Sequence, residues 1–565
     1  MKTIRATRLC VLWLLAGSLS ISIASAETYT VTATRDSLAG SLRQAIEEAN
    51  AHAGPDTIIF NIPASDPGYA AGVFTIRPDT ALPDLTDDGT VVDGTSQSAN
   101  QGDTNPLGPE IELDGTAAGT SNGFTVLGGS IQIRGLVINR FGEVGIRVMG
   151  TTARGALIVG NYIGTDPTGM IGQGNLYGGI WVEFGANGAR IGGSTMDERN
   201  IISGAAISVN LKTGTGVYVE EADSIRIIGN YVGVNRDGTA TIPNAGVGVC
   251  IRETHHTVIG GTNPGEGNVI GGNHDCGIVV RMPTATMNTI SGNFIGTDPS
   301  GLLDLGNSLQ GIQLDFGARN NMIGPSNTIM FSTGSGVRVR HDSTFGNTIS
   351  GNTITRNANQ GISHSLGGNG GLPPPIITAA TATAVSGSAA PGSTVEIFSD
   401  SADEGAVFEG AVLADAGGNF SWMGAPRGPN VTATCTDTAG NTSEFAAPVV
   451  VTGVSQDAGP DLPGTFILEQ NYPNPFNPST TIRYGLPVQS HVTLTVYNTL
   501  GQQVAALVRG EQEPGYHEAV FDAAGHASGV YLCRLQVRAL GSAIGRDPKS
   551  GAGDFMETRK LLLLR

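Results

Sequence analysis

Charged and aromatic residues are scarce in this chain. Of its 565 residues, 14% are charged and 5% are aromatic, and 49 acidic residues against 31 basic ones give a net charge of -18. Such a chain has no basic footprint for nucleic acid and is repelled by anionic membrane surfaces. It also lacks a phosphate-binding loop, a catalytic-triad spacing and a nucleotide-binding fingerprint. We therefore expect neither nucleic acid nor a membrane surface as a partner.

Long apolar runs are confined to the N-terminus. Residues 1–26 begin with basic side chains, continue with an apolar run from Leu9 to about Ile23 and end on the small residues Ala24, Ser25 and Ala26. This pattern is typical of a secretory signal peptide cleaved after Ala26, and its apolar run is too short to span a bilayer comfortably. We therefore predict a mature protein that is exported through the periplasm and has no membrane span.

Glycine, by contrast, is abundant, with 83 residues. A phrase of glycine followed by two apolar residues around a variable one returns at Gly145, Gly179, Gly216, Gly246, Gly277, Gly311, Gly336 and, more weakly, Gly361. Subtracting neighbouring numbers gives steps of 34, 37, 30, 31, 34, 25 and 25 residues, which lie in the range of solenoid repeats. Each phrase alternates like a strand with one buried face, so one such strand is expected in every coil.

The segments between these phrases alternate in kind. Gly-Asn-Tyr/Phe-Ile/Val-Gly occurs at Gly160, Gly229 and Gly292, whereas Ile-Gly-Gly occurs at Ile191 and Ile259. The repeating unit is therefore two coils long. Short strands separated by Gly and Asn corners, with no helical spacing between them, predict an all-β fold, a right-handed parallel β-helix.

Asparagines recur at fixed places in this unit. Inward amides stacked coil upon coil satisfy one another and the corner backbone, so we predict a structural ladder. Its expected members are Asn161, Asn200, Asn230, Asn268 and Asn293.

Four cysteines remain after signal removal, namely Cys250, Cys276, Cys435 and Cys533. Cys250 follows Gly246 by four residues and Cys276 precedes Gly277 by one, so they are expected at opposite ends of neighbouring strands. At roughly 3.3 Å per residue their separation is about 16 Å, beyond disulfide reach. The other two fall in different predicted domains, so no disulfide is expected.

The mature N-terminus reads strand, helix, strand within residues 27–73. An amphipathic helix from Ser37 to about His52, with Leu38 and Leu42 in its apolar stripe, suits the lid of a solenoid end. Residues 36–50, of the form Asp-Ser-x-x-Gly-Ser-Leu-Arg-Gln-Ala-Ile-x-x-Ala-Asn, resemble a motif that opens many secreted bacterial β-helix proteins. That group has varied activities, so the resemblance supports the fold and leaves the function open.

The β-helix is expected over residues 74–372, and Pro373 to Pro375 predict a stiff linker after it. Residues 373–452 have short alternating segments that predict a small immunoglobulin-like β-sandwich. Residues 436–444 resemble the last hairpin of bacterial immunoglobulin-like modules, which implies a spacer domain. A second linker is expected at 453–465.

The last domain, residues 466–565, carries the most specific resemblance. Leu468-Glu-Gln-Asn-Tyr-Pro-Asn-Pro-Phe-Asn-Pro-Ser-Thr-Thr-Ile482, Val496-Tyr-Asn-Thr-Leu-Gly-Gln-Gln-Val504, Gly529-Val-Tyr-Leu and Lys560-Leu-Leu-Leu-Leu-Arg565 resemble the C-terminal sorting domain of type IX secretion cargo. The resemblance implies a β-sandwich recognised by the type IX secretion machinery, and a protein that is secreted or held at the outer cell surface. A polar stretch from Ala539 to Glu557 departs from the family pattern and is expected to be a longer hairpin loop.

Chemistry is expected on the outward face of the repeated strand. Its third and fifth residues point outward, which gives the pairs Arg147/Met149, Trp181/Glu183, Tyr218/Glu220, Gly248/Cys250, Val279/Arg281, Gln313/Asp315 and Arg338/Arg340. This arrangement resembles β-helix enzymes that act on acidic polysaccharides, in which rings stack on sugars and arginines bind sugar acids. We call these outward pairs the stripe. Its glycan-binding candidates are Trp181, Tyr218, Arg281, Asp315, Arg338 and Arg340.

Three functions stay open at this point. The leading one is a glycan-binding or adhesive protein, expected to be monomeric. The first alternative is a polysaccharide lyase or glycoside hydrolase that uses Glu183, Glu220 and Arg281, because stacked carboxylates one coil apart approach the spacing of a retaining glycosidase. However, the sequence lacks the Asn-Thr-Asp, Gly-His-Gly and Arg-Ile-Lys signatures of polygalacturonases. The second alternative is a purely structural surface protein.

No cofactor is expected, and calcium is the one metal left open. Two stacked acids, Glu183 and Glu220, are suitable ligands for a hard cation. Asp166 and Asp298 lie in matched Thr-Asp-Pro-x-Gly loops, whose simpler reading is a turn.

Overall fold

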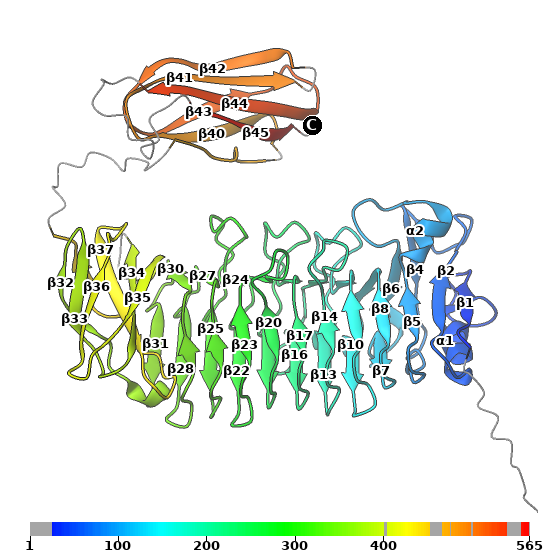
Figure 1. Cartoon of the computed structure of the whole chain (residues 1–565). Coiled ribbons are helices and arrows are strands. Elements are labelled where there is room, and N and C mark those ends of the chain that lie inside the picture. The colour runs from blue at the N-terminus through cyan, green and yellow to red at the C-terminus, as the bar shows by residue number, and fades with distance from the viewer. Residues whose placement is uncertain are drawn as a thin grey trace, which may run out of the picture. The chain divides into compact units, whose positions relative to one another are not determined.

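The computed structural model describes residues 25–400, 404–452, 466–474, 476–498, 501–539 and 555–563. Residues 1–24 of the predicted signal peptide and the whole expected linker 453–465 lie outside the described residues. The chain divides into two compact units, residues 1–452 and 453–565. The first unit contains three long sheets whose strands follow one another in the order of the chain (Figure 1).

Sheet one has eleven parallel strands in the order β1 (Thr28–Val31), β2 (Thr57–Phe60), β5 (Val91–Asp93), β8 (Gln132–Arg134), β11 (Leu157–Val159), β14 (Arg190–Ile191), β17 (Arg226–Ile227), β20 (Val258–Gly260), β23 (Thr289–Ser291), β26 (Met322–Ile323) and β29 (Thr348–Ile349). Sheet two has nine: β7 (Phe124–Val126), β10 (Val144–Met149), β13 (Gly178–Glu183), β16 (Thr215–Glu220), β19 (Val249–Arg252), β22 (Ile278–Arg281), β25 (Ile312–Asp315), β28 (Val337–Arg340) and β31 (Ile362–Ser365).

Sheet three has eleven strands, of which the first two pair antiparallel: β3 (Tyr69–Ala70), β4 (Val73–Ile76), β6 (Ile111–Asp114), β9 (Leu136–Asn139), β12 (Tyr162–Ile163), β15 (Ile201–Ile202), β18 (Tyr231–Val232), β21 (Val269–Ile270), β24 (Phe294–Ile295), β27 (Thr328–Met330) and β30 (Thr353–Thr355). From β7 onward, successive coils give one strand to each of the three sheets, whereas the first coils give none to sheet two. The predicted parallel β-helix is therefore confirmed.

The core of the β-helix is a column of aliphatic side chains. Ile146, Ile180, Val217, Val249 and Ile278 are successive partners in sheet two and are all fully buried. Each fully buried aliphatic side chain is worth about 1.5–3 kcal/mol relative to an exposed one. The alternation of the repeated phrase thus selects the residues that fill the interior.

The asparagines form a continuous ladder at the corner between sheets one and three. All five predicted members lie in it, and the side-chain amide of each donates to the side-chain oxygen of the next at 2.8–3.2 Å. The ladder continues through Asn327 to Asn352, at 3.0 and 2.9 Å. The same amides also bind corner carbonyls, such as Ile133 O at 2.9 Å from Asn161. Buried amides are satisfied in this way at every step.

The N-terminal end is covered by helix α1 (Leu42–Ala51), which packs on β1 and β2. It begins later than the sequence suggests because Ser41 is its N-cap and accepts a hydrogen bond from Gln44 N. Leu38 precedes the helix with φ +76° and is 75% exposed, so its expected place in the apolar stripe is wrong. A short helix, α2 (Ser96–Gln101), and a 3-10 turn, η1 (Gly115–Ala117), lie in the early coils.

After a second 3-10 turn, η2 (Gly368–Gly371), the chain forms two small antiparallel sheets. One contains β32 (Ile376–Ala380), β33 (Ala384–Ser388) and β36 (Asn419–Met423), and the other β35 (Val407–Leu413), β34 (Thr394–Asp400), β37 (Asn430–Thr436) and β38 (Val449–Val450). We call residues 376–452 the capping domain, because they cover the last coil of the β-helix.

Hydrogen bonds join this domain to the last coil. Ile354 and Gly405 exchange two backbone hydrogen bonds, at 3.0 and 2.8 Å. The Glu396 carboxylate accepts from Gly351 N at 3.1 Å, and the Thr442 hydroxyl accepts from Ile349 N at 2.9 Å. These contacts occupy backbone groups at the open end of the solenoid, which would otherwise be unpaired. The domain that the sequence predicts as a spacer after a linker is part of one compact unit with the β-helix.

The second unit also has two antiparallel sheets. One contains β39 (Ile467–Leu468), β40 (Ser479–Leu486) and β43 (Gly515–Asp522), and the other β42 (Gln503–Gln512), β41 (Ser490–Asn498), β44 (Gly529–Ala539) and β45 (Phe555–Leu563). Their inner faces share one core of buried aliphatic and aromatic side chains. β44 and β45 pair antiparallel, and β45 begins at Phe555, within the stretch that was expected to be loop. Residues 540–554 of that stretch lie outside the described residues.

All four cysteines of the described chain are free and buried. Burial raises the pKa of the Cys250 and Cys533 thiols to about 12. No helix in the described part of the chain is long and apolar enough to cross a membrane.

Candidate functional site

The register of sheet two corrects one pair of the stripe. Val249 pairs with Val217 and Ile278, so Cys250 follows Tyr218 in the column and Arg252 follows Glu220. The expected pair Gly248/Cys250 is therefore wrong by two residues. Gly246 fits the start of the repeated phrase in the sequence. In the structure, the glycine that aligns with the phrase glycines of the neighbouring coils is Gly248. Arg252 is thus a stripe residue that sequence reasoning missed.

The two aromatic candidates are on the outward face but are not open to solvent. Trp181 is 6% and Tyr218 3% exposed, and both belong to a buried cluster with Cys250 and Val279. Leu211, from the segment between β15 and β16, packs against this cluster. We call residues 204–214 the strap. Sequence alternation identifies the face of a strand but does not reveal a loop that folds over it.

Lys212 of the strap occupies the space beside these rings. Its Nζ lies 4.3 Å from the Trp181 ring centroid and 5.3 Å from that of Tyr218. It also forms an ion pair with Glu183, which is fully buried and bound in addition by Arg147 Nε at 2.9 Å. Glu183 is therefore held by two cations, which offset the cost of burying its carboxylate.

The next acids of the stripe are paired as well. Arg252 forms an ion pair with Glu220 and contacts Glu253 at 3.1 Å. Arg281 lies 3.4 Å from Asp315, and its guanidinium is 4.6 Å from the Phe316 ring. Burial raises the pKa of Asp315 despite this arginine. Glu183 and Glu220 are neighbours in register, one coil apart, but each has its own basic partner.

The C-terminal end of the stripe lines a cavity. A cavity of about 760 Å³ lies between the last coils and the capping domain. Arg338 lines it together with Gln310, Gln360, Ser363, Glu404 and Phe445. We call this cavity the terminal groove.

Arg338 differs from the other arginines of the stripe. Its register partners are Gln313 and Ser363, and its Nε donates to Ser365 Oγ at 3.4 Å. Within the described residues it forms no ion pair, whereas Arg147, Arg252 and Arg281 each bind a carboxylate. Arg340 follows at the next outward position, and its Nε is buried without a hydrogen-bond partner. The structure thus brings Arg338 to the groove and leaves Trp181 and Tyr218 outside it.

The loop aspartates cap their own turns. Asp166 accepts from Ile171 N at 2.9 Å and from Thr168 Oγ1 at 2.6 Å, and Asp298 accepts from Leu303 N and Ser300 Oγ at the same two distances. These hydrogen bonds lower the pKa of Asp298 against the opposing effect of burial. The described chain contains no group of three or more His, Cys, Asp or Glu side chains arranged to hold a metal ion.

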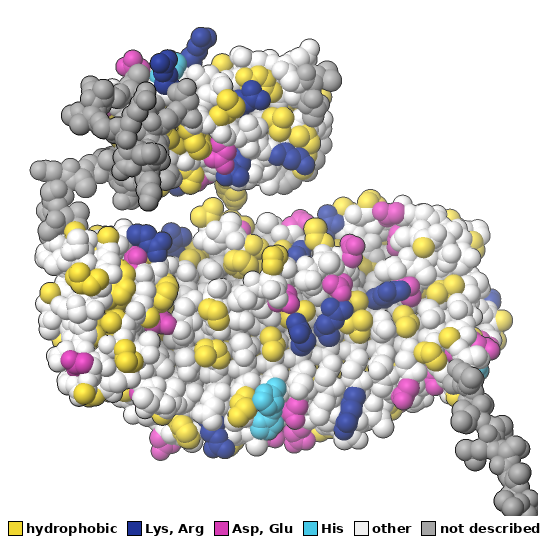
Figure 2. Space-filling view, in the orientation of Figure 1, with side chains coloured by type: hydrophobic (Ala, Val, Ile, Leu, Met, Phe, Trp, Pro, Cys, Tyr) yellow, Lys and Arg dark blue, Asp and Glu magenta, His cyan; other side chains and the backbone are white. Residues whose placement is uncertain are grey.

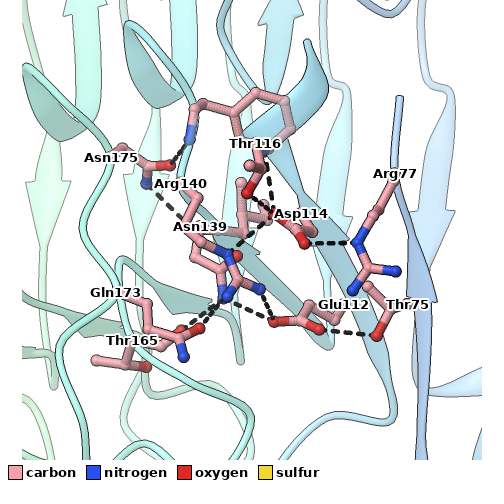
Figure 3. A network of polar contacts seen from close by, with 12 residues as sticks. Thr75, Arg77, Glu112, Asp114, Thr116, Asn139, Arg140, Thr165, Gln173 and Asn175 are labelled. Atoms are coloured by element: carbon pink, nitrogen blue, oxygen red, sulfur yellow. Dashed lines mark hydrogen bonds and ion pairs between the residues drawn. The ribbon is translucent and has the colours of Figure 1, made fainter. Parts of the chain in front are cut away.

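A second charged cluster lies on sheet three near the N-terminal end (Figure 3). Arg140 bridges Glu112 and Asp114 at 2.8 and 2.9 Å, and Arg77 binds Asp114 at 2.8 Å. Asn139 also donates to Glu112 at 2.9 Å. Hydrogen bonds and the two arginines lower the pKa of Asp114 although burial opposes them. Each acid is satisfied within the cluster, and the only sequence signal was alternation in the irregular coil at Ile111.

Two family models match parts of the chain. Residues 470–542 match the secretion system C-terminal sorting domain, and residues 198–372 match a model described as periplasmic copper-binding protein (NosD). None of the curated proteins compared with the chain matches it. The chain therefore carries a NosD-type parallel β-helix and a type IX sorting domain, and it is a secreted or cell-surface protein served by the type IX machinery. The expectations for the C-terminal domain and for localisation are confirmed.

The solved structures that the chain resembles are distant from it. The periplasmic alginate epimerase AlgG is 14% identical over 52% of this chain and 66% of its own, with a TM-score of 0.28. Tailspike protein 4 of bacteriophage CBA120 is 11% identical over 92% and 65%, with a TM-score of 0.23. Dimeric latent PorU from Porphyromonas gingivalis is 17% identical over 34% and 20%, with a TM-score of 0.15. The chain spans less than two thirds of the length of each of these structures.

Proposed function

We propose that this secreted protein binds anionic glycans without turning them over, and that the terminal groove is the binding site. The observation that carries the proposal is the Arg338 guanidinium, which lines the terminal groove and has no carboxylate partner within the described chain. A guanidinium is suited to bidentate binding of a sugar carboxylate or sulfate.

The other lining groups support sugar recognition. Gln310, Asn359 and Gln360 offer amides, and Ser363 and Ser365 offer hydroxyls, to the hydroxyl groups of a sugar. Phe445 supplies a half-buried ring at the capping-domain side. A cavity with a few convergent polar groups and one ring has the size and character of a ligand site.

The stripe favours binding over hydrolysis. A general acid or base must reach its substrate and exchange a proton near the working pH. Glu183 is fully buried between two cations, and Glu220 is paired with Arg252. The alternative of a polysaccharide lyase or hydrolase needs these acids to be free.

The test uses the mature chain and a panel of anionic and neutral polysaccharides: polygalacturonate, alginate, chondroitin sulfate, xylan and dextran. Affinity electrophoresis measures retention, while reducing ends and the ultraviolet absorbance of unsaturated sugars measure turnover. We expect retention by at least one anionic polymer, no turnover, and binding that is about tenfold weaker or more in Arg338→Ala. Arg226→Ala, which changes a half-exposed arginine of sheet one, is the matched control.

Each other outcome favours a different function or a different binding site. Turnover that disappears in Glu220→Ala or Arg281→Ala would establish the enzyme alternative. Equal retention of wild type and Arg338→Ala would place the ligand outside the terminal groove. Neither retention nor turnover on any polymer would leave a structural surface protein.

A further inference from the structure

The corner between sheets one and three carries two further hollows. One, of about 410 Å³, is lined by Arg199, Tyr231, Phe294 and the glycine-rich loop 261–267. The other, of about 630 Å³, is lined by Tyr162 and residues 196–199. Arg199 lines both hollows, so the two adjoin at this side chain, and we call them together the path. None of their lining residues belongs to the terminal groove.

The two-coil repeat builds these hollows in equivalent places. Tyr162, Tyr231 and Phe294 are the first residues of β12, β18 and β24, with β15 and β21 between them. At each site a backbone amide binds the overhanging loop: Gly160 N donates to Glu198 O at 3.1 Å, and Gly229 N to Glu266 O at 2.9 Å. A ring therefore recurs at every second coil, about 10 Å apart at the usual strand spacing.

The three rings differ in how much of them is covered. A Cβ placed on Gly169 or Gly238 would lie 2.9 Å from the ring of Tyr162 or Tyr231, whereas one on the equivalent Gly301 would meet nothing within 4 Å. The turn glycine that contacts the first two rings therefore does not contact Phe294, whose half-buried ring lines the smaller hollow. The Tyr231 ring is covered by the Arg199 guanidinium, which lies 4.1 Å from its centroid. A guanidinium stacked on a ring adds a second flat surface to the same hollow.

The lining of the path contains equal numbers of basic and acidic side chains. The larger hollow is lined by three arginines and three acids, namely Arg134, Arg190, Arg199, Glu110, Asp197 and Glu198. Arg190 and Glu198 are 2.8 Å apart. Basic and acidic side chains also lie next to one another on the β-helix face seen in Figure 2. Because the lining has no net charge and the whole chain is acidic, the path offers no attraction to a polyanion.

We propose that this corner binds a neutral, linear polysaccharide that runs along the coils. One sugar ring stacks on Phe294, and another stacks on Arg199 above Tyr231. The spacing of two coils, about 10 Å, corresponds to two sugar rings joined end to end. The exposed glycine backbone of loop 261–267 offers amides and carbonyls to the sugar hydroxyls. This site is independent of the terminal groove and takes an uncharged ligand.

The test is isothermal titration calorimetry of the mature chain with cellohexaose, chitohexaose, xylohexaose and the corresponding disaccharides. We expect at least one hexasaccharide to bind, and its disaccharide to bind at least about tenfold more weakly, because a disaccharide cannot stack on Phe294 and on Arg199 at the same time. Phe294→Ala and Arg199→Ala should each weaken hexasaccharide binding about tenfold. Phe345→Ala, at a 42% exposed ring outside the path, is the matched control and should not change it. Unchanged melting temperatures show that the variants fold.

Several results would overturn the proposal. They are equal binding of disaccharide and hexasaccharide, full affinity in both Phe294→Ala and Arg199→Ala, and binding of anionic polymers alone. Absence of binding to every neutral oligosaccharide would overturn it too. Arg338→Ala distinguishes the two sites. If only this variant, and neither Phe294→Ala nor Arg199→Ala, loses hexasaccharide binding, the neutral ligand binds in the terminal groove. Loss of polyanion binding alone in Arg338→Ala would leave both proposals intact.

Discussion

At the scale of single residues, the stripe is held together by ion pairs whose members come from different coils. Glu183 is the central case, because it is fully buried and bound by Arg147 and by Lys212 of the strap. Removing one partner from a buried charge costs more than replacing the whole pair. Lys212 thus holds the strap to the sheet together with Leu211, which packs against the buried cluster.

Lys212→Met is expected to lower the free energy of unfolding of the first unit by about 1–3 kcal/mol, because Glu183 then keeps only Arg147. Urea unfolding followed by tryptophan fluorescence measures this change. Arg154→Met, at an exposed arginine, is the control and should stay within about 0.5 kcal/mol of wild type. Adding Glu183→Gln to Lys212→Met should recover part of the loss. Equal stability of Lys212→Met and the control would show that the ion pair does not form.

His364 gives the capping interface a dependence on pH. It pairs in register with the buried Val339, and its backbone amide donates to Glu444 at 2.6 Å. Burial lowers the pKa of His364 below 6.5, although the Glu444 charge opposes this shift. The unfolded chain then binds the proton more readily. The resulting stabilisation is complete above about pH 6.5 and is lost as the pH falls through the folded pKa.

The expected result is that the melting temperature of the wild type falls more steeply than that of His364→Gln between about pH 7.5 and about pH 5. Differential scanning calorimetry of both proteins across this range provides the measurement. His256→Gln, at a corner-loop histidine, should follow the wild type. Parallel curves for wild type and His364→Gln would contradict the prediction.

Residue alternation predicted which side chains face outward, but not which of them solvent reaches. Arg147, Trp181 and Glu183 are outward as expected, yet the strap buries the latter two. The strap contains no repeat phrase, and its packing depends on contacts of Leu211 and Lys212 with residues far along the chain. The error at Cys250 arose because Gly246 and Gly248 both precede an apolar residue, so local sequence gives two registers. Only the ladder of pairing partners selects one of them.

At the scale of elements, both ends of the β-helix are covered, each in a different way. Helix α1 covers the first coil through an apolar stripe that a helical wheel reveals. The capping domain covers the last coil through backbone and side-chain hydrogen bonds from Gly405, Glu396 and Thr442. Such polar contacts have no periodicity, so the sequence predicted the second cover as a spacer.

A chain that ends at Leu372 is therefore expected to aggregate or to unfold at a lower temperature, because its last coil exposes unpaired strand edges. A chain that ends at Thr452 keeps the capping domain and should melt like the first unit of the whole protein. Size-exclusion chromatography and thermal unfolding compare the two. A monomeric and equally stable chain 27–372 would show that the β-helix needs no cap.

At the scale of the whole molecule, function and export are assigned to separate compact units. Residues 453–565 have their own core and carry the sorting domain, while both proposed glycan sites lie in residues 1–452. Sequence blocks predicted the sorting domain well, because its turns and strand ends are short, distinctive phrases that can be recognised one by one. The glycan sites could not be predicted so directly, since each combines residues from several coils.

Deletion of residues 466–565 is expected to hold the protein in the periplasm of a host with type IX secretion, without loss of glycan binding. Immunoblots of cell fractions and of the medium follow the protein, and affinity electrophoresis of the periplasmic form tests its fold. Deletion of the capping domain alone should instead impair folding and leave the sorting signal in place. Secretion of the chain without residues 466–565 would contradict the assignment.

The asparagine ladder sets a rule for how such a protein changes length in evolution. Each amide passes its hydrogen bond to the next coil, and long and short corners alternate along the same column. An insertion of part of a coil would break the ladder. An insertion of one whole coil would place two long corners, or two short corners, next to each other. Duplication or loss of a complete two-coil unit keeps every amide paired. It also adds or removes one aromatic position. Gene duplication would therefore change the length of ligand that the protein binds in steps of one two-coil unit.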